Sequence, residues 1–231
     1  MNSPPSFFLL ASVLAAVFSA PALAQQNTLK LGIMHIQPQS SASDFSGAFT
    51  PRGISLEVRD KSTAFISYTR ELDERWNVEL ALGLPPTHDI TLKLNNPTLT
   101  GSVQAMNHQI GSRVRQVAST VFVNYKFLGA SSALRPLVGA GINYTRFDKT
   151  RSNAAGNALN GGATSISLED SVGLALQAGL AWRLDSQWSV SAALATAQVQ
   201  SKITTHTLGI TRNADIKFRP QVFVVAAGYS F

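Results

Sequence analysis

The chain has 231 residues, no cysteine, and 19 Lys and Arg against 13 Asp and Glu, which gives a net charge of +6. Only 14% of its residues are charged, well below the roughly 25% of an ordinary soluble domain, although 45% are hydrophobic. This balance excludes a charge-rich disordered chain and a helical membrane protein, and the absence of cysteine excludes disulfides, thiolate metal sites and a cysteine nucleophile.

The first predicted element is an N-terminal export signal. Residues 7–18 form an almost unbroken apolar run, and Ala22-Leu23-Ala24 provides the small residues that a signal peptidase accepts. The run is too short for a spanning helix, which needs about 20 apolar residues. We therefore predict a cleaved signal peptide over residues 1–24, Sec-type export to the periplasm, and a mature domain over residues 25–231.

Apolar residues alternate along the mature chain, which is the period of a β-strand with two different faces. In residues 76–84, for example, Trp76, Val78 and Leu80 share one face. The same pattern predicts eight strands, near residues 28–37, 62–71, 76–84, 117–128, 136–147, 172–184, 188–200 and 217–231.

The connections between these strands alternate between short turns and long loops. The short turns lie near residues 71–75, 129–134 and 185–187, and the long loops near 38–61, 85–116, 148–165 and 201–216. This pattern predicts an all-β fold, an eight-stranded antiparallel up-and-down transmembrane β-barrel with its turns in the periplasm and its loops outside.

A soluble secreted β protein, with its apolar face turned inward, is the alternative. Two features favour the outer membrane of a Gram-negative cell: aromatic residues such as Trp76 and Tyr229 stand at strand ends, and the faces opposite the apolar ones in the sixth and seventh strands are small. The chain also ends in Phe231, with apolar or aromatic residues at every second position before it. Such an ending is typical of the signal that the barrel-assembly machinery recognises.

Alternation with the aromatic face outward places two groups of side chains in the lumen. The group near the periplasmic turns is charged: Lys30, Glu71, Glu79, Lys126 and Arg183. The group farther out is apolar: Met34, Ile36, Phe65, Phe122, Leu137, Val222 and Val224. Unpaired charges are costly in so narrow a tube, so we predict a charge plug that closes the periplasmic half. The apolar group either forms a pocket or conduit for a small hydrophobic molecule, with release sideways into the bilayer, or packs the lumen shut.

The excess positive charge lies largely in the predicted loops. The residues expected to face the phosphates of lipopolysaccharide are Arg113, Arg115, Lys149, Arg151, Lys202 and Arg212. A solvated loop explains any one of them almost as well. Nucleic acid is not an expected partner, because an exported membrane protein meets little of it.

The histidines and serines do not predict an enzyme. The chain lacks a Gly-x-Ser-x-Gly element, and no histidine pair has the short spacing of metal ligands. Three of its four histidines, His88, His108 and His206, lie in predicted loops or at strand ends, where such residues are usually solvated. We expect no catalysis, no metal and no cofactor.

Several segments resemble the OmpW family of small outer-membrane proteins. The sequence RPLVGAGINYT (residues 135–145), with Phe147, is similar to that family's most characteristic strand, and LEDSVG (168–173) to its sixth strand. WNVE (76–79) with PPTHDI (85–90) resembles the third strand and its loop, and Pro220 with GYSF (228–231) the last strand. The chain departs from the family pattern at Leu137, Val172 and residues 112–116.

The resemblance implies an eight-stranded barrel whose hydrophobic lumen serves the passage or binding of small hydrophobic molecules. We therefore predict passive binding or admission of such molecules. The alternative is an adhesin, receptor or envelope-stabilising protein with a packed lumen.

Overall fold

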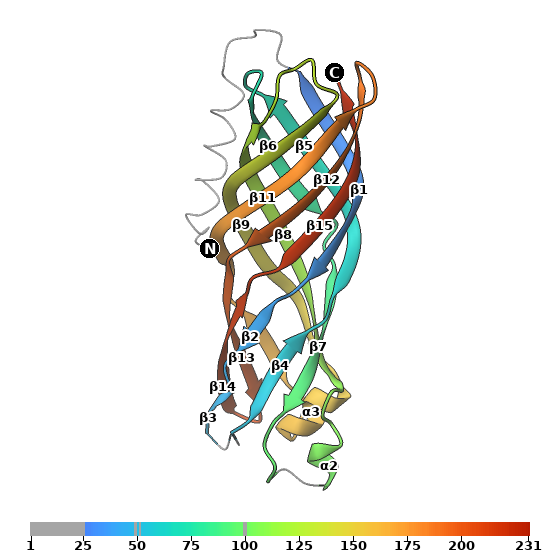
Figure 1. Cartoon of the computed structure of the whole chain (residues 1–231). Coiled ribbons are helices and arrows are strands. Elements are labelled where there is room, and N and C mark those ends of the chain that lie inside the picture. The colour runs from blue at the N-terminus through green and yellow to red at the C-terminus, as the bar shows by residue number, and fades with distance from the viewer. Residues whose placement is uncertain (1–25, 49, 51, 99–100) are drawn as a thin grey trace.

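A computed structural model describes residues 26–48, 50, 52–98 and 101–231, so the predicted signal peptide lies outside the described residues. Within this part of the chain, eight strands close into an antiparallel barrel, which confirms the predicted fold (Figure 1). They are β1 (Asn27–Gln37), β5 (Lys61–Glu71), β6 (Trp76–Gly83), β8 (Ile110–Lys126), β9 (Leu134–Ser152), β11 (Ser171–Arg183), β12 (Trp188–Ala197) and β15 (Gln221–Ser230). Each pairs with the next, and β15 pairs with β1, so the barrel keeps no free edge.

The four long connections are largely regular structure, so their description as loops was wrong. They contain β2 (Ser40–Ala42), β3 (Ser46–Gly47), β4 (Ile54–Val58), β7 (Thr87–Leu94), β10 (Ser165–Leu168), β13 (Val199–Thr207), β14 (Ile210–Phe218), α2 (Gly101–Gln104) and α3 (Ala154–Asn160). β4 and β7 lengthen the barrel sheet beside β8, while β10, β13, β14, β2 and β3 form a second sheet. β13 shows no apolar alternation in the sequence. Its buried positions include Ser201, Thr205 and Thr207, where a pattern of hydrophobic residues would be expected.

The outer face of the barrel is apolar, as a lipid-facing surface must be. Ile33, Leu174 and Leu194 are each more than 60% exposed, and their strand neighbours point into the lumen. The apolar band ends before β7, where the residues that alternate with its buried ones include Asp89 and Lys93. Among the described residues, no helix is long and apolar enough to cross a membrane.

Aromatic pairs mark the end of the barrel that carries the short turns. The rings of Trp76 and Tyr125 meet edge to face with centroids 5.0 Å apart, and those of Trp188 and Tyr229 do so at 5.2 Å. These pairs form part of the predicted interfacial girdle, because indole and phenol rings combine an apolar body with a polar group.

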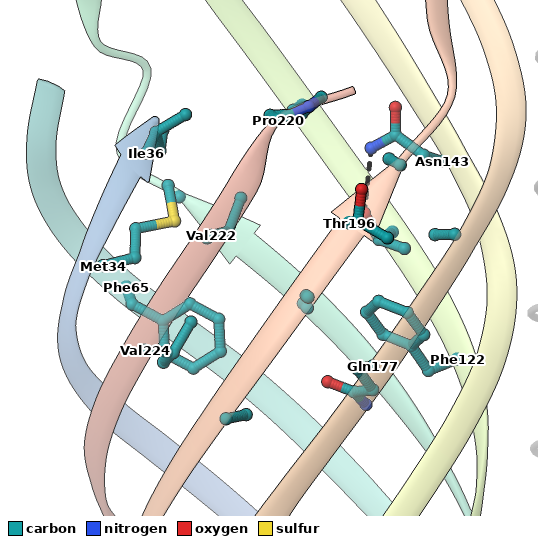
Figure 2. Close-up of a pocket in the computed structure, with 18 of the residues that line it drawn as sticks. Met34, Ile36, Phe65, Phe122, Asn143, Gln177, Thr196, Pro220, Val222 and Val224 are labelled. Atoms are coloured by element: carbon teal, nitrogen blue, oxygen red, sulfur yellow. Dashed lines mark hydrogen bonds between the residues drawn. The ribbon is translucent and has the colours of Figure 1, made fainter. Parts of the chain in front are cut away.

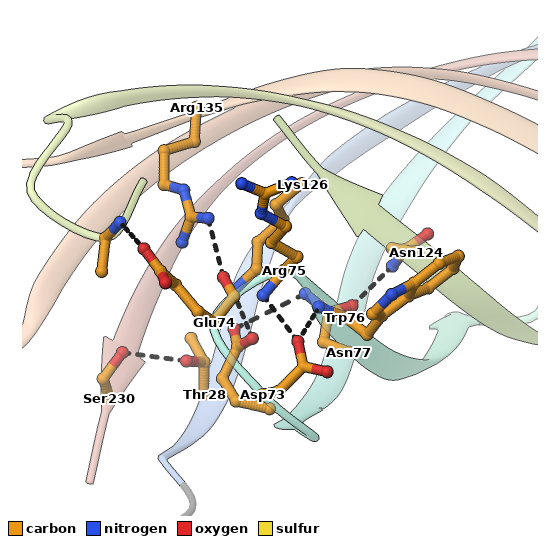
Figure 3. Close-up of polar contacts among 12 residues, drawn as sticks. Thr28, Asp73, Glu74, Arg75, Trp76, Asn77, Asn124, Lys126, Arg135 and Ser230 are labelled. Atoms are coloured by element: carbon orange, nitrogen blue, oxygen red, sulfur yellow. Dashed lines mark hydrogen bonds and ion pairs between the residues drawn. The ribbon is translucent and has the colours of Figure 1, made fainter. Parts of the chain in front are cut away.

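Two of the short turns are held by the same pattern of side-chain-to-backbone hydrogen bonds. The carboxylates of Asp73 and Asp185 each accept hydrogen bonds from the backbone N–H groups two and three residues later, over 2.7 to 2.8 Å. Figure 3 shows the first of them, where Glu74 also accepts a bond from the backbone N–H of Ala130, in the turn between β8 and β9. Local hydrogen bonds thus fix both turns directly before the Trp residue that begins the next strand, Trp76 in β6 and Trp188 in β12.

Acid should weaken these turns. The N–H groups of Arg75 and then Trp76 hold the pKa of Asp73 below its usual value, and those of Trp188 and then Gln187 do the same for Asp185. Because the folded-state pKa is depressed, the stabilisation is present above the unfolded-state pKa and is lost as pH falls through the folded-state value. Urea unfolding of refolded barrels between about pH 5 and pH 2 should therefore show a smaller loss of stability in D73N/D185N than in the wild type. An equal loss in both proteins would contradict this prediction.

Candidate functional site in the barrel lumen

One cavity of about 120 Å³ lies in the lumen (Figure 2). All of the apolar residues predicted to face the lumen line it: Met34, Ile36, Phe65, Phe122, Leu137, Val222 and Val224. Met34, Phe65 and Val224 pack together on one side, while Phe122 approaches from β8 on the other. An apolar cavity of about 150 Å³ is known to hold benzene, so this space suits one small ring or a short alkyl chain.

A buried carboxylate lies at the periplasmic side of this cavity. Glu79 is only 4% exposed, and its Oε1 accepts hydrogen bonds from Lys30 Nζ at 2.8 Å and Ser67 Oγ at 2.7 Å. Its Oε2 accepts from Gln177 Nε2 at 3.1 Å and Asn124 Nδ2 at 3.3 Å. Donors from four other strands thus meet one acid from β6, which compensates much of the cost of burying its charge.

A second ion pair lies beside the first. Lys126 binds Glu71, and the amide of Asn77 donates to Glu71 at 3.5 Å. The two pairs are joined because Asn124 Nδ2 donates to Asn77 Oδ1 at 2.8 Å. We call the two ion pairs and their amide partners the charge network. It brings together four of the five charges that the sequence placed in a plug.

The fifth charge, Arg183, does not take part, which corrects its predicted place. Its guanidinium donates to the backbone carbonyls of Ala130 at 2.8 Å and Ser131 at 3.2 Å. Arg183 is the last residue of β11, so its exposed side chain reaches the turn between β8 and β9 at the rim. Carbonyl oxygens of that turn thus accept the hydrogen bonds of Arg183, where a carboxylate partner was expected.

Gly139 makes room for the charge network. A Cβ atom at this position would lie 1.9 Å from Asn124 Oδ1 and 3.1 Å from Gln177 Cγ. Its place in the characteristic strand over residues 135–145 therefore has a physical reason, since any side chain there would displace two amides that bind Glu79.

Apolar packing closes the outer end of the lumen. A small second cavity, of about 30 Å³, adjoins the first and shares Ile36, Gln116 and Pro220 with it. Beyond it, the extension of the barrel sheet by β4 and β7 packs against the second sheet. The buried cluster between them, which we call the outer core, consists of Leu56, Val58, Ile90, Leu92, Val114, Ile203, Ala214 and Ile216.

The strand pairing is interrupted where β12 and β15 leave the barrel. β12 pairs with β15 up to Thr196, and β13 pairs with β14 from Val199, but the intervening Ala197 and Gln198 make no ladder with Arg219 and Pro220. Pro220 has no N–H to donate, which explains part of this interruption. Two of the remaining N–H groups bind other segments: that of Gln198 donates to the carbonyl of Leu174, and that of Arg219 to the carbonyl of Gln39.

A hollow on the outer surface lies at this interruption. Both Arg219 and Thr196 line the hollow, and Thr196 also lines the cavity in the lumen. Most of the residues that line the hollow belong to β11, β12 and β15.

The basic residues predicted to face lipopolysaccharide divide into three groups. Lys149, Arg151 and Lys202 are exposed. Arg113 and Arg115 each bind an acid, with Arg113 Nε 2.7 Å from an oxygen of Asp89 and Arg115 Nε 2.6 Å from one of Asp148.

Arg212 faces inward, which corrects its predicted position. Ala214 and Ile216 of the same strand are buried in the outer core, and strand alternation places Arg212 on that same side.

The histidines form no metal site in the described part of the chain, where no group of three or more His, Cys, Asp or Glu side chains is arranged to hold a metal ion. His88 was expected to be a solvated loop residue, and this expectation is wrong. It is 4% exposed in β7, lines the small second cavity, and lies with Nδ1 3.2 Å from the carbonyl oxygen of Arg59. Burial lowers its pKa, so the ring is neutral near physiological pH.

Comparison with known proteins places this architecture in a family. The family model described as "OmpW family" matches residues 26–231. Outer membrane protein W of Vibrio cholerae serotype O1 is 27% identical over 95% of this chain and 96% of its own length. The dibenzothiophene metabolism operon protein PahQ of Pseudomonas aeruginosa is 27% identical over 58% of this chain and 59% of its own. The crystal structure of the outer membrane protein OprG from Pseudomonas aeruginosa shares the fold, with a TM-score of 0.78, 24% identity, and coverage of 90% of this chain and 96% of that one.

The predicted family, fold and location are thereby confirmed. The chain belongs to the OmpW family and is an outer-membrane β-barrel protein.

Proposed function

We propose that the barrel passively binds or admits small hydrophobic molecules in its lumen cavity. The observation that carries this proposal is an apolar cavity that ends on the charge network. An apolar molecule becomes more stable by leaving water for such a wall, whereas the ion pair between Lys30 and Glu79 offers it no such gain. The molecule therefore stops above the charge network. The proposed function needs no catalysis and no cofactor.

Release sideways into the bilayer is part of the proposal. The interruption supports it, because no ladder hydrogen bond joins Ala197–Gln198 to the opposite segment Arg219–Pro220. Opening the wall there therefore breaks none. Leu194, which is 61% exposed, marks the lipid surface beside it. An apolar molecule that passes this point enters the outer leaflet without crossing water.

One relative supports the class of ligand. The name of PahQ refers to dibenzothiophene metabolism, and dibenzothiophene is an apolar aromatic molecule. The lumen cavity is too small for three fused rings as it stands. A ligand of that size requires new rotamers of Met34 and Phe65, and Met is the side chain that adapts most readily.

Uptake of a hydrophobic dye by liposomes that contain the purified barrel tests the proposal. Phe122→Arg and Val222→Arg each place a cation in the cavity and should reduce uptake to nearly the rate of protein-free liposomes. Ala195→Phe, which fills the cavity without charge, should reduce it as well. Gln200→Arg adds the same charge at an exposed position of β13 and should leave uptake unchanged. Equal uptake by wild type and by folded cavity variants would refute the proposal.

The alternative function, an adhesin, receptor or envelope stabiliser, draws on the outer core. Two ordered sheets packed on each other present a defined outer surface, which a protein used only for passage does not require. Wild-type uptake no faster than that of protein-free liposomes would favour this alternative.

Two further contacts belong to the proposal. Lys149, Arg151 and Lys202 are free to bind phosphates of lipopolysaccharide, since all three are exposed beyond the apolar band. Phe231, which is 64% exposed, is the residue through which the barrel-assembly machinery recognises the chain.

A further inference from the structure

A third cavity lies at the outer end of the molecule, on the far side of the outer core from the lumen. Its volume is about 210 Å³. Leu56 of β4 and Leu92 of β7 form one wall. Ile166 and Ile203 of the second sheet form another, and Leu159 of α3 covers the cavity. Side chains of the outer core separate this cavity from the lumen, so it is a site of its own.

Arg212 is the cation of this outer cavity. Its Nε donates to Thr50 Oγ1 at 3.0 Å, and one terminal nitrogen donates to Asn160 Oδ1 at 3.0 Å. These two neutral partners use two of the five N–H groups of the guanidinium. Among the described residues, no carboxylate lies within ion-pair distance of Arg212, in contrast to Arg113 and Arg115, which both bind an acid nearby.

Among the described residues, the wall of the outer cavity holds no acid. Its other polar residues, in the part of the chain that the structure describes, are hydroxyl and amide side chains such as Thr164, Thr205 and Asn160. An apolar chamber with one guanidinium and no carboxylate is complementary to a molecule that carries an apolar body and one negative charge. A carboxylate suits the planar fork of a guanidinium particularly well.

We propose that the outer cavity binds a small carboxylate with an apolar body, such as a monocyclic aromatic acid, with its carboxylate on Arg212. The volume agrees with this class, because a cavity of about 150 Å³ already holds benzene. The inference does not depend on passage through the lumen.

Arg212 also links β14, Thr50 and α3, so a purely structural role has to be distinguished from binding. A structural role predicts that loss of Arg212 loosens the outer sheets. It predicts no preference of the wild-type cavity between a carboxylate and a neutral molecule of the same shape.

The test uses the full barrel in nanodiscs, with isotope-labelled isoleucine methyl groups observed by NMR. Ile54, Ile166 and Ile203 line the outer cavity, and Ile33, on the lipid face, reports on ligand dissolved in the bilayer. The probes are benzoate and its neutral analogue benzyl alcohol. Benzoate should shift the three cavity methyls saturably, with an affinity at least roughly tenfold above that of benzyl alcohol, as expected for hydrogen bonds to a charged group.

The preference for benzoate should disappear in Arg212→Gln and persist in part in Arg212→Lys. Lys217→Gln removes one positive charge from an exposed position of the same strand and should leave it intact. Equal affinity of the wild type for both probes, or shifts that follow Ile33, would overturn the proposal even if the Arg212 variants do not fold. Unchanged benzoate binding by folded Arg212→Gln would overturn it as well.

Discussion

Replacing Glu79 by Gln is expected to destabilise the barrel by about 3–5 kcal/mol, the cost of leaving one partner of a buried ion pair uncompensated. Lys30 would lose the carboxylate oxygen 2.8 Å from its Nζ while remaining enclosed by the lumen, and Asn124 and Gln177 would lose a charged acceptor. Equilibrium unfolding in urea, with the barrel in detergent micelles or lipid, measures the change.

Two controls show whether burial causes this effect. Lys30→Met in the Glu79→Gln background removes the stranded cation and should recover most of the lost stability, because no uncompensated buried charge then remains. Lys93 and Glu57 form an ion pair over 3.7 Å with side chains 44% and 49% exposed. Glu57→Gln should therefore cost only about 0–1 kcal/mol. A Glu79→Gln loss as small as that of Glu57→Gln would show that the charge network contributes little to stability.

A disulfide across the wall interruption is expected to stop uptake of a hydrophobic dye. Gln198 and Arg219 are not paired, but the pairs on either side, Thr196 with Gln221 and Val199 with Phe218, have the same offset and place these two residues opposite each other. The Gln198→Cys/Arg219→Cys variant should therefore oxidise readily, and the chain has no native cysteine that could compete. If release occurs here, uptake by liposomes should fall to the background rate after oxidation and return after addition of a reductant.

A matched disulfide within the intact ladder serves as the control. Val190 and Ala227 are directly paired between β12 and β15, away from the interruption. Val190→Cys/Ala227→Cys should leave uptake unchanged in both redox states. Uptake that survives oxidation of the 198–219 variant would refute release at this point, while the cavity variants Phe122→Arg and Val222→Arg would still test binding in the lumen.

The two cavities give the two ends of the barrel different chemistry. The lumen cavity adjoins Glu79 and Lys30, which are already paired, so an apolar molecule meets no uncompensated charge there. The outer cavity has a largely apolar wall with some hydroxyl and amide groups, and a guanidinium without a carboxylate partner among the described residues. The first suits a neutral ligand, and the second an anionic one.

The sequence alone determined the barrel and the side of it on which most residues lie. A strand that faces lipid on one side must alternate, so the positions of Met34, Phe65 and Val224 in the lumen follow from the pattern. The same reasoning placed Lys30 and Glu79 together, because opposite charges in a tube of eight strands are forced into contact. It failed where alternation was carried by Thr and Ser, as in β13, and the long loops were therefore overestimated.

Only the tertiary structure decided what each inward side chain meets. Arg183 lies at a rim where turn carbonyls replace an acid, and Arg212 lies in a cavity instead of on the surface, because in each case the partner comes from a segment distant in sequence. The interruption at Pro220 likewise depends on which strand lies opposite. Periodicity records the face of a strand, whereas contacts across the lumen and between the outer sheets depend on how the strands pair and stagger when the barrel closes.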